Sequence, residues 1–160
     1  MPGAAAAQTS SPVASALRAA VQSMGRNLIA AADDMPADKY GFKPTPPQMS
    51  FGQVILHLAQ GNEFMCSSLA GNKAPDEAKL APEDPKDKLV PRLKRSFEFC
   101  NSAVASMDDS KLADSVPFFG GRKVPRATMV MTVGEDYADH YSQLAIYMRL
   151  NGLLPPTARK

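Results

Sequence analysis

Two histidines and one aspartate are the residues of this chain best suited to hold a metal ion. His57 and His140 are the only histidines among 160 residues, and Asp136 lies four positions before His140. Residues i and i+4 share one face of a helix, so a carboxylate and an imidazole would lie side by side there. Two histidines and one carboxylate, with positions left open for water or substrate, are typical of a catalytic metal site. Such a donor set accepts zinc, iron, nickel or manganese.

The same residues also allow an interpretation without a metal. His140 lies near the middle of the apolar stripe of its predicted helix, and Asp136 lies about 40° away on the same side. A carboxylate removed from water needs a compensating charge, which Arg122 or Arg126 could supply as well as a metal could. Asp136 and His140 would then form a hydrogen-bonded pair. His57 borders the apolar stripe of its own helix, which suits a cleft wall or the surface.

Two tyrosines beside this cluster are candidate substrate contacts. Tyr137 and Tyr141 each adjoin a member of the cluster in sequence. A phenol combines an apolar ring with a polar hydroxyl, which suits contact with a small molecule. Aromatic residues on a helix also serve as packing residues, so both roles stay open.

The composition excludes several classes of protein. The chain contains 18 Lys and Arg against 16 Asp and Glu, a balance that does not favour binding to nucleic acid. Two cysteines and two histidines cannot form a three-histidine site, a four-cysteine zinc site or a disulfide framework within one chain. No apolar run is long enough to span a membrane.

Four segments have helical periodicity, and none alternates convincingly at the spacing of a strand. Ser50 followed by Gln53 is a capping box that begins the second helix. Pro91 is compatible with the third helix only in its first turn. The segment 108–125, which contains a Phe-Phe-Gly-Gly turn, is predicted to be an irregular loop. The predicted helices span about residues 12–33, 51–70, 87–107 and 126–150.

The link between the second and third helices is long enough to change their relative direction. Residues 72–86 could extend over roughly 50 Å, whereas a helix of about 18 residues is roughly 27 Å long. We therefore expect an all-α, four-helix bundle with a crossover between helices 2 and 3, in an up-down-down-up order. The domain is predicted to span residues 12–157.

The two cysteines test this topology. Cys66 and Cys100 occupy similar heights if the second and third helices are parallel, and a disulfide could then join them. In an antiparallel pair the heights would differ by roughly a dozen ångströms, too far for a disulfide. An exported protein would be expected to oxidise such a pair. The alternative is two free, buried cysteines that act as small apolar residues.

The N-terminal residues 1–11 are predicted to be a flexible tail or the remnant of a signal peptide. Four consecutive alanines and Gln8 resemble the small-residue end of a secretory signal. Localisation is therefore expected to be exported or periplasmic, and cytoplasmic if these residues are only a tail.

Several motifs together resemble the DinB-like superfamily, over about residues 13–157. They include Leu56-His-Leu-Ala59 and Asp139-His-Tyr-Ser-Gln-Leu144. A bacterial subgroup of that superfamily ends in Tyr-x-Arg-x-Asn-Gly, as in Tyr147-Met-Arg-Leu-Asn-Gly152 here. The remaining motifs are Met35-Pro-Ala-Asp-Lys-Tyr-Gly-Phe-Lys-Pro-Thr45 and Ser50-Phe-Gly-Gln53.

The resemblance implies a bundle with parallel second and third helices and a divalent metal held by three histidines. One family histidine matches His57, and the second member of a His-x-x-x-His pair matches His140. The first member falls at Asp136, a departure from the family pattern that still leaves a ligand for zinc or nickel. The resemblance also implies a homodimer and, in some members, transfer or isomerisation reactions that use a small thiol.

Two functions follow from these observations. The first is a metal-dependent hydrolase or thiol transferase, with a site at His57, Asp136 and His140 and a small-molecule or thiol substrate. The alternative is a non-catalytic, exported bundle that has lost the metal site and acts as a binding or interaction module. Asp136 discriminates between them, because it would hold a metal in the first and pair with Arg122 or Arg126 in the second.

Overall fold

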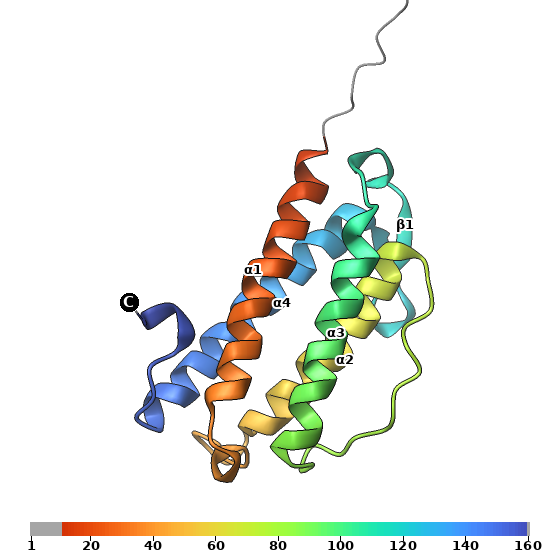
Figure 1. Ribbon diagram of the computed structural model, residues 1–160. Coiled ribbons are helices and arrows are strands. Elements are labelled where there is room, and N and C mark those ends of the chain that lie inside the picture. The colour runs from red at the N-terminus through yellow and green to blue at the C-terminus, as the bar shows by residue number, and fades with distance from the viewer. Residues whose placement is uncertain (1–10, 160) are drawn as a thin grey trace, which may run out of the picture.

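Four long helices dominate this computed structural model, which describes residues 11–159 (Figure 1). The predicted number of helices is confirmed, and each predicted boundary falls within two residues of the observed one. Residues 1–10, where most of the predicted tail or signal remnant falls, lie outside the described part. The helices are α1 (Pro12–Asp34), α2 (Phe51–Ala70), α3 (Lys86–Ala105) and α4 (Arg126–Leu150).

The capping box at the start of α2 is present as predicted. The Ser50 hydroxyl accepts a hydrogen bond from the Gln53 backbone N–H at 3.2 Å, and the Gln53 side-chain oxygen accepts one from the Ser50 N–H at 2.7 Å. These bonds satisfy two donors that the first turn leaves free. Gly71 ends the helix with a φ of 70°, a conformation that glycine adopts without strain.

Helices α2 and α3 run in the same direction. Asn62 donates to the hydroxyl of Ser96, and Cys66 is bonded to Cys100. Both contacts join residues that are 34 positions apart. An offset that stays constant along two helices requires them to be parallel, and Figure 1 shows the link between them returning along the outside of the bundle.

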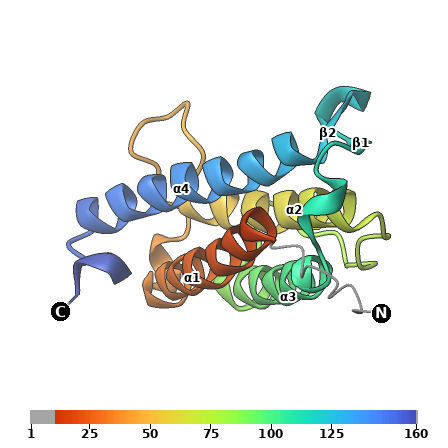
Figure 2. The same ribbon diagram turned by 90° about the horizontal axis from the view of Figure 1, so that it is seen from above.

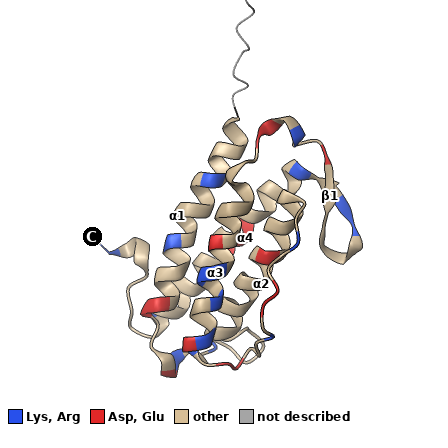
Figure 3. Ribbon diagram, turned by 45° about the vertical axis from the view of Figure 1, so that its right-hand side comes forward, with Lys and Arg blue, Asp and Glu red and all other residues tan. Residues whose placement is uncertain are grey.

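A buried ion pair fastens this link to the helices. The guanidinium of Arg92 binds both carboxylate oxygens of Glu63, at 2.6 and 2.7 Å, and donates to the carbonyl of Ala78 in the link at 2.9 Å. Glu77, also in the link, binds Arg95 through two hydrogen bonds of 2.8 Å, which lower the pKa of its carboxyl. Figure 3 shows acidic and basic positions on the link and on α3.

Replacing Glu63 with glutamine is expected to lower the free energy of unfolding by about 2 kcal/mol. The change removes the nearer of two carboxylates that face the buried Arg92 guanidinium and leaves Glu77 at 3.7 Å, and a charged group that loses its closest partner carries a cost of this size. Denaturant unfolding measures the difference. Glu98→Gln, at an exposed position of α3, is the matched control and should change stability by less than about 0.5 kcal/mol. Equal effects of the two substitutions would contradict a structural role for the ion pair.

The segment before α4 differs from the prediction of an irregular loop. It forms a two-stranded antiparallel hairpin in which Val116 pairs with Val124, and Gly120 and Gly121 turn the chain with φ of 68° and 71°. Strands of three residues are too short to show an alternating pattern. The hairpin packs at one end of the bundle, where Pro117 accepts a hydrogen bond from Ser68. Its strands are β1 (Ser115–Pro117) and β2 (Lys123–Pro125).

Pro91 lies in the second turn of α3, not in the first turn as predicted. The helix begins at Lys86, so Pro91 is its sixth residue. Proline cannot donate to the carbonyl of Asp87, but both residues are exposed, and water can bind that carbonyl instead.

The four helices enclose one continuous apolar core. α2 packs along α3 and α4, and α1 covers the other side of both α3 and α4. Figure 2 shows this arrangement from above, with α2 and α4 in one layer and α1 and α3 in the other. No helix within residues 11–159 combines the length and apolar character that a membrane crossing needs. The described part of the chain also contains four short 3₁₀ turns: η1 (Ala37–Lys39), η2 (Asp109–Lys111), η3 (Phe119–Gly121) and η4 (Pro156–Ala158).

Candidate metal centre

The contact between α2 and α4 brings together the three residues that are predicted to bind a metal. His57 is an exposed residue of α2, whereas Asp136 and His140 lie one turn apart on α4. One potential ligand atom from each residue lies within 4.8 Å of the other two. The two imidazole rings meet edge to face, with their centroids 4.8 Å apart. His57 therefore lies at the solvent side of the cluster and His140 at the buried side.

Asp136 has the environment that a metal ligand needs. Its Oδ1 lies 3.4 Å from His140 Nε2, and its Oδ2 is buried with no hydrogen-bond partner among the described residues. Ligand atoms about 2.1 Å from a tetrahedral ion are about 3.4 Å apart, so the first distance fits two ligands of one ion. A buried carboxylate oxygen without a partner is costly. A divalent cation would remove that cost, so the residues present fit such an ion.

The glycine at position 61 leaves room beside this carboxylate. A Cβ atom at Gly61 would lie 3.9 Å from Asp136 Oδ2 and 3.6 Å from the Met65 methyl carbon. Gly61 is one helical turn after His57, so it belongs to the same face of α2. Larger side chains at this position would extend toward the carboxylate.

A chain of hydrogen bonds fixes the orientation of the His140 ring. The Tyr147 hydroxyl donates to the carbonyl of Met49, so its oxygen accepts from the Gln143 amide nitrogen, at 3.1 Å. The Gln143 oxygen therefore faces His140 and accepts a hydrogen bond from Nδ1, also at 3.1 Å. With Nδ1 protonated, Nε2 is the nitrogen left to bind an ion next to Asp136, as is usual for histidine ligands.

The pKa of the His140 imidazole depends on its contacts with Asp136 and Gln143. Burial lowers the pKa of its imidazole, but hydrogen bonds to Asp136 and Gln143 and the nearby negative charges outweigh burial, and the pKa lies above its ordinary value. A metal ion binds only the unprotonated nitrogen, so protons and a metal ion compete for His140 Nε2.

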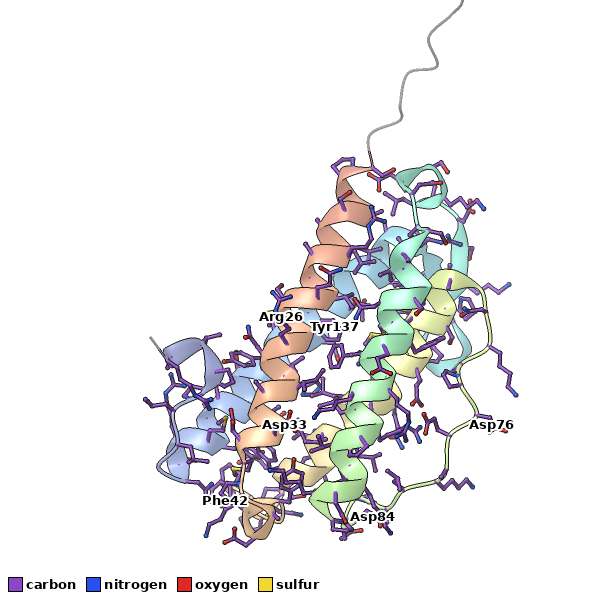
Figure 4. The ribbon with its side chains drawn as sticks, viewed as in Figure 1. Arg26, Asp33, Phe42, Asp76, Asp84 and Tyr137 are labelled. Carbon is purple, nitrogen blue, oxygen red and sulfur yellow. A yellow bond between two sulfur atoms is a disulfide. The ribbon has the colours of Figure 1, made fainter. Side chains whose placement is uncertain are left out.

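The two tyrosines occupy different environments. Tyr137 is fully buried, donates to Asn62 Oδ1 at 2.8 Å and points into the interior of the bundle (Figure 4). Burial also raises the pKa of its hydroxyl. This position does not fit the expected substrate contact, because the core excludes a substrate. Tyr141 is partly exposed, and its hydroxyl exchanges two hydrogen bonds of 2.9 Å with Thr157 near the C-terminus.

The arginine alternative for Asp136 is not the arrangement seen. Within residues 11–159, the ion pairs of Asp136 include His140 but neither Arg122 nor Arg126. Arg122 instead packs over the Phe118 ring and donates to the Phe119 carbonyl in the hairpin.

The cysteines are joined as the parallel topology allows. Cys66 and Cys100 form a disulfide with a Cα–Cα distance of 5.2 Å, and both side chains are buried. This disulfide lies in the interface of α2 with α3, beside the buried Asn62 and Tyr137 hydroxyl. It is a structural link and not part of the candidate metal site.

The protein is a helical bundle in which a crossover joins two parallel helices. It carries a histidine–carboxylate cluster where α2 contacts α4, and these two features define its class. The family model described as the DinB superfamily matches residues 20–144. The chain therefore belongs to the DinB superfamily. Comparison with curated proteins found no match.

Solved structures with the same fold include DinB-like proteins of two bacilli. The Bacillus cereus protein has 18% sequence identity and a TM-score of 0.72, over 89% of this chain and 95% of that one. The Bacillus subtilis protein has 20% identity and a TM-score of 0.71, over 91% and 99%. A mycothiol-dependent maleylpyruvate isomerase is also similar, with 12% identity and a TM-score of 0.61 over 82% of this chain and 59% of that one.

Proposed function

We propose that this protein binds one divalent metal ion, zinc or nickel, through His57, Asp136 and His140. The observation that carries the proposal is the buried Oδ2 of Asp136, which has no partner among residues 11–159 and lies beside two imidazoles. Asp136 then replaces the first histidine of the family's His-x-x-x-His pair. The exposed side of His57 leaves the site open to solvent and to a small molecule.

The proposed reaction is hydrolysis or the transfer of a small thiol. A bound divalent ion lowers the pKa of a water molecule or a thiol and so supplies a nucleophile near neutral pH. The likeness to an isomerase that is named as mycothiol-dependent supports a thiol substrate. His140 and Gln143 would orient the buried side of the site, and His57 would form the wall that a substrate approaches.

Metal titration of protein produced without an affinity tag tests the proposal. Calorimetric titration with Zn²⁺ or Ni²⁺, after removal of metals on a chelating resin, should show one ion bound per chain with a release of protons. Binding at several weak sites, or no binding of either ion, would contradict it.

Replacing Gln143 with leucine is expected to weaken metal binding about tenfold. The substitution keeps the size of the side chain but removes the acceptor that holds His140 Nδ1, and changes of this kind typically cost tenfold to a hundredfold in affinity. Competition with a chromophoric chelator measures the change. Ser142→Ala, at the adjacent exposed position, should leave the affinity unchanged. An equal affinity of the leucine variant and the wild type would show that Gln143 does not position the ligand.

We also propose that the protein folds in an oxidising compartment, as an exported or periplasmic protein. The disulfide between Cys66 and Cys100 supports this, because such bonds persist outside the reducing cytoplasm. Two freely alkylated thiols in protein isolated from its native cells would contradict the proposal. The non-catalytic alternative shares this localisation, and the absence of any metal binding would favour it.

A homodimer is the proposed assembly, as the family resemblance implies. Three large apolar side chains are exposed near the end of α4, and they would lose contact with water in such an interface. Light scattering during size-exclusion chromatography should give twice the chain mass of 17.1 kDa. A monomer at micromolar concentration would contradict the proposal. The three side chains are Ile146, Leu150 and Leu154.

A further inference from the structure

An open cavity of about 390 Å³ lies beside His57, outside the three-residue cluster. One wall is the face of α2 that carries Gln53, His57 and Gln60, and the other is the loop before α2, with Lys43 and Gln48. This volume is at the small end of the range for metabolite pockets. The cavity therefore suits a small molecule that reaches the exposed side of His57.

The glutamines present donors to this cavity. The side-chain oxygen of Gln53 already accepts from the Ser50 N–H at 2.7 Å, and a backbone N–H can only donate, so the free end of Gln53 is its NH₂ group. The oxygen of Gln48 accepts from the Thr45 hydroxyl at 2.9 Å, which leaves its NH₂ group free as well. Two amide donors and the Lys43 ammonium group therefore line one cavity.

The charge of the cavity is positive. Among the described residues, no acidic side chain lines it, and Lys43 forms no ion pair. The adjoining cavity shares Lys43 and contains Glu83 and Asp84. Asp84 is paired with Lys88 at 2.9 Å, and Glu83 is exposed, so solvent screens its charge. An anion in the cavity would meet the Lys43 ammonium group and several hydrogen-bond donors, with few acceptors to repel it.

We propose that this cavity binds a small organic carboxylate, with the carboxylate at Lys43 and the far end of the molecule toward His57. An ammonium group and NH₂ donors complement carboxylate oxygens. The inference deepens the proposed function by assigning the class of the molecule on which the small thiol or the water would act. It rests on that function only for the chemistry at the His57 end of the cavity. The carboxylate contact itself needs no metal.

Titration of ¹⁵N-labelled, metal-free protein with succinate tests the proposal. Metals are removed on a resin, because a soluble carboxylate chelator would compete. Succinate should shift the side-chain NH₂ signals of the three glutamines in the cavity, whereas uncharged succinamide should not. Lys43→Met should raise the dissociation constant of succinate about fivefold, the effect of losing one partly exposed ion pair. Lys43→Arg should stay within about twofold of the wild type.

The control is Lys73→Met, at an exposed position of the link that lines neither cavity, and it should leave succinate binding unchanged. Equal loss in the Lys43 and Lys73 variants, shifts confined to other surfaces, or tighter binding of inorganic phosphate than of succinate would overturn the proposal. Binding of succinate that depends on Lys43 in a protein that binds no zinc would refute the metal site alone. Stoichiometric zinc with no binding of succinate would refute the carboxylate pocket alone.

Discussion

Replacing Asp136 with asparagine is expected to lower the affinity for Zn²⁺ or Ni²⁺ at least about a hundredfold. The amide keeps the shape of the side chain but removes the charge that stabilises a divalent ion, and loss of a direct ligand costs more than loss of its supporting hydrogen bond. In metal-free protein the same substitution should change the free energy of unfolding by less than about 1 kcal/mol, since the amide keeps the shape of a partly exposed side chain whose charged partner is His140. Chelator competition and denaturant unfolding measure the two effects.

Asp139→Asn provides the matched control for this pair of measurements. Asp139 is an exposed carboxylate on the same helix, three residues after Asp136. Its charge acts on His140 only through space, so its loss should change metal affinity by less than about twofold and leave stability at the wild-type value. If Asp136→Asn destabilises the metal-free protein by several kcal/mol, Asp136 serves the fold and not an ion.

Removal of the disulfide is expected to lower the free energy of unfolding by about 3–4 kcal/mol. The bond closes a loop of 34 residues, and the entropy that such a loop removes from the unfolded chain has this magnitude. Substitution of both Cys66 and Cys100 with alanine avoids placing hydroxyl groups in the core. Denaturant unfolding of the oxidised wild type against this double variant measures the loss.

Chemical reduction of the wild type gives an independent comparison. Reduced wild type and the double alanine variant should unfold at similar denaturant concentrations, because both lack the link between α2 and α3. A loss below about 1 kcal/mol in both proteins would contradict a stabilising role for the disulfide. The secondary structure of both should remain helical by circular dichroism.

The helices could be predicted because each is long and carries a periodic apolar stripe. The length of the 15-residue link and the positions of Cys66 and Cys100 are compatible with parallel second and third helices. The disulfide between the two cysteines agrees with the parallel arrangement. The hairpin at 115–125 could not be predicted, since its strands are too short to show a period. The cap of α1 could not be predicted either. Its carboxylate comes from Asp109, which accepts hydrogen bonds from the N–H groups of Val13 and Ala14, more than 90 positions away in the sequence.

The candidate site was only partly visible in the sequence. The spacing of Asp136 and His140 on one helix is local, so their contact followed from helix geometry. Helical spacing puts His57 only at the border of its apolar stripe. Its approach to His140 depends on how α2 and α4 are rotated against each other, which no local pattern encodes. Gln143 was missed as a supporting residue. Its position three residues after His140 was a signal, but its orientation depends on Tyr147 and a loop carbonyl almost 100 residues away.

X-ray absorption spectroscopy at the zinc edge of the loaded, tag-free protein identifies the ligands of the ion. We expect scattering from two imidazole rings and from oxygen ligands, with one imidazole lost in His57→Ala. No sulfur ligand is expected, because both cysteines are in the disulfide. A spectrum with only oxygen ligands, or one unchanged by substitution of His57, would contradict the assignment of His57, Asp136 and His140 as the metal site.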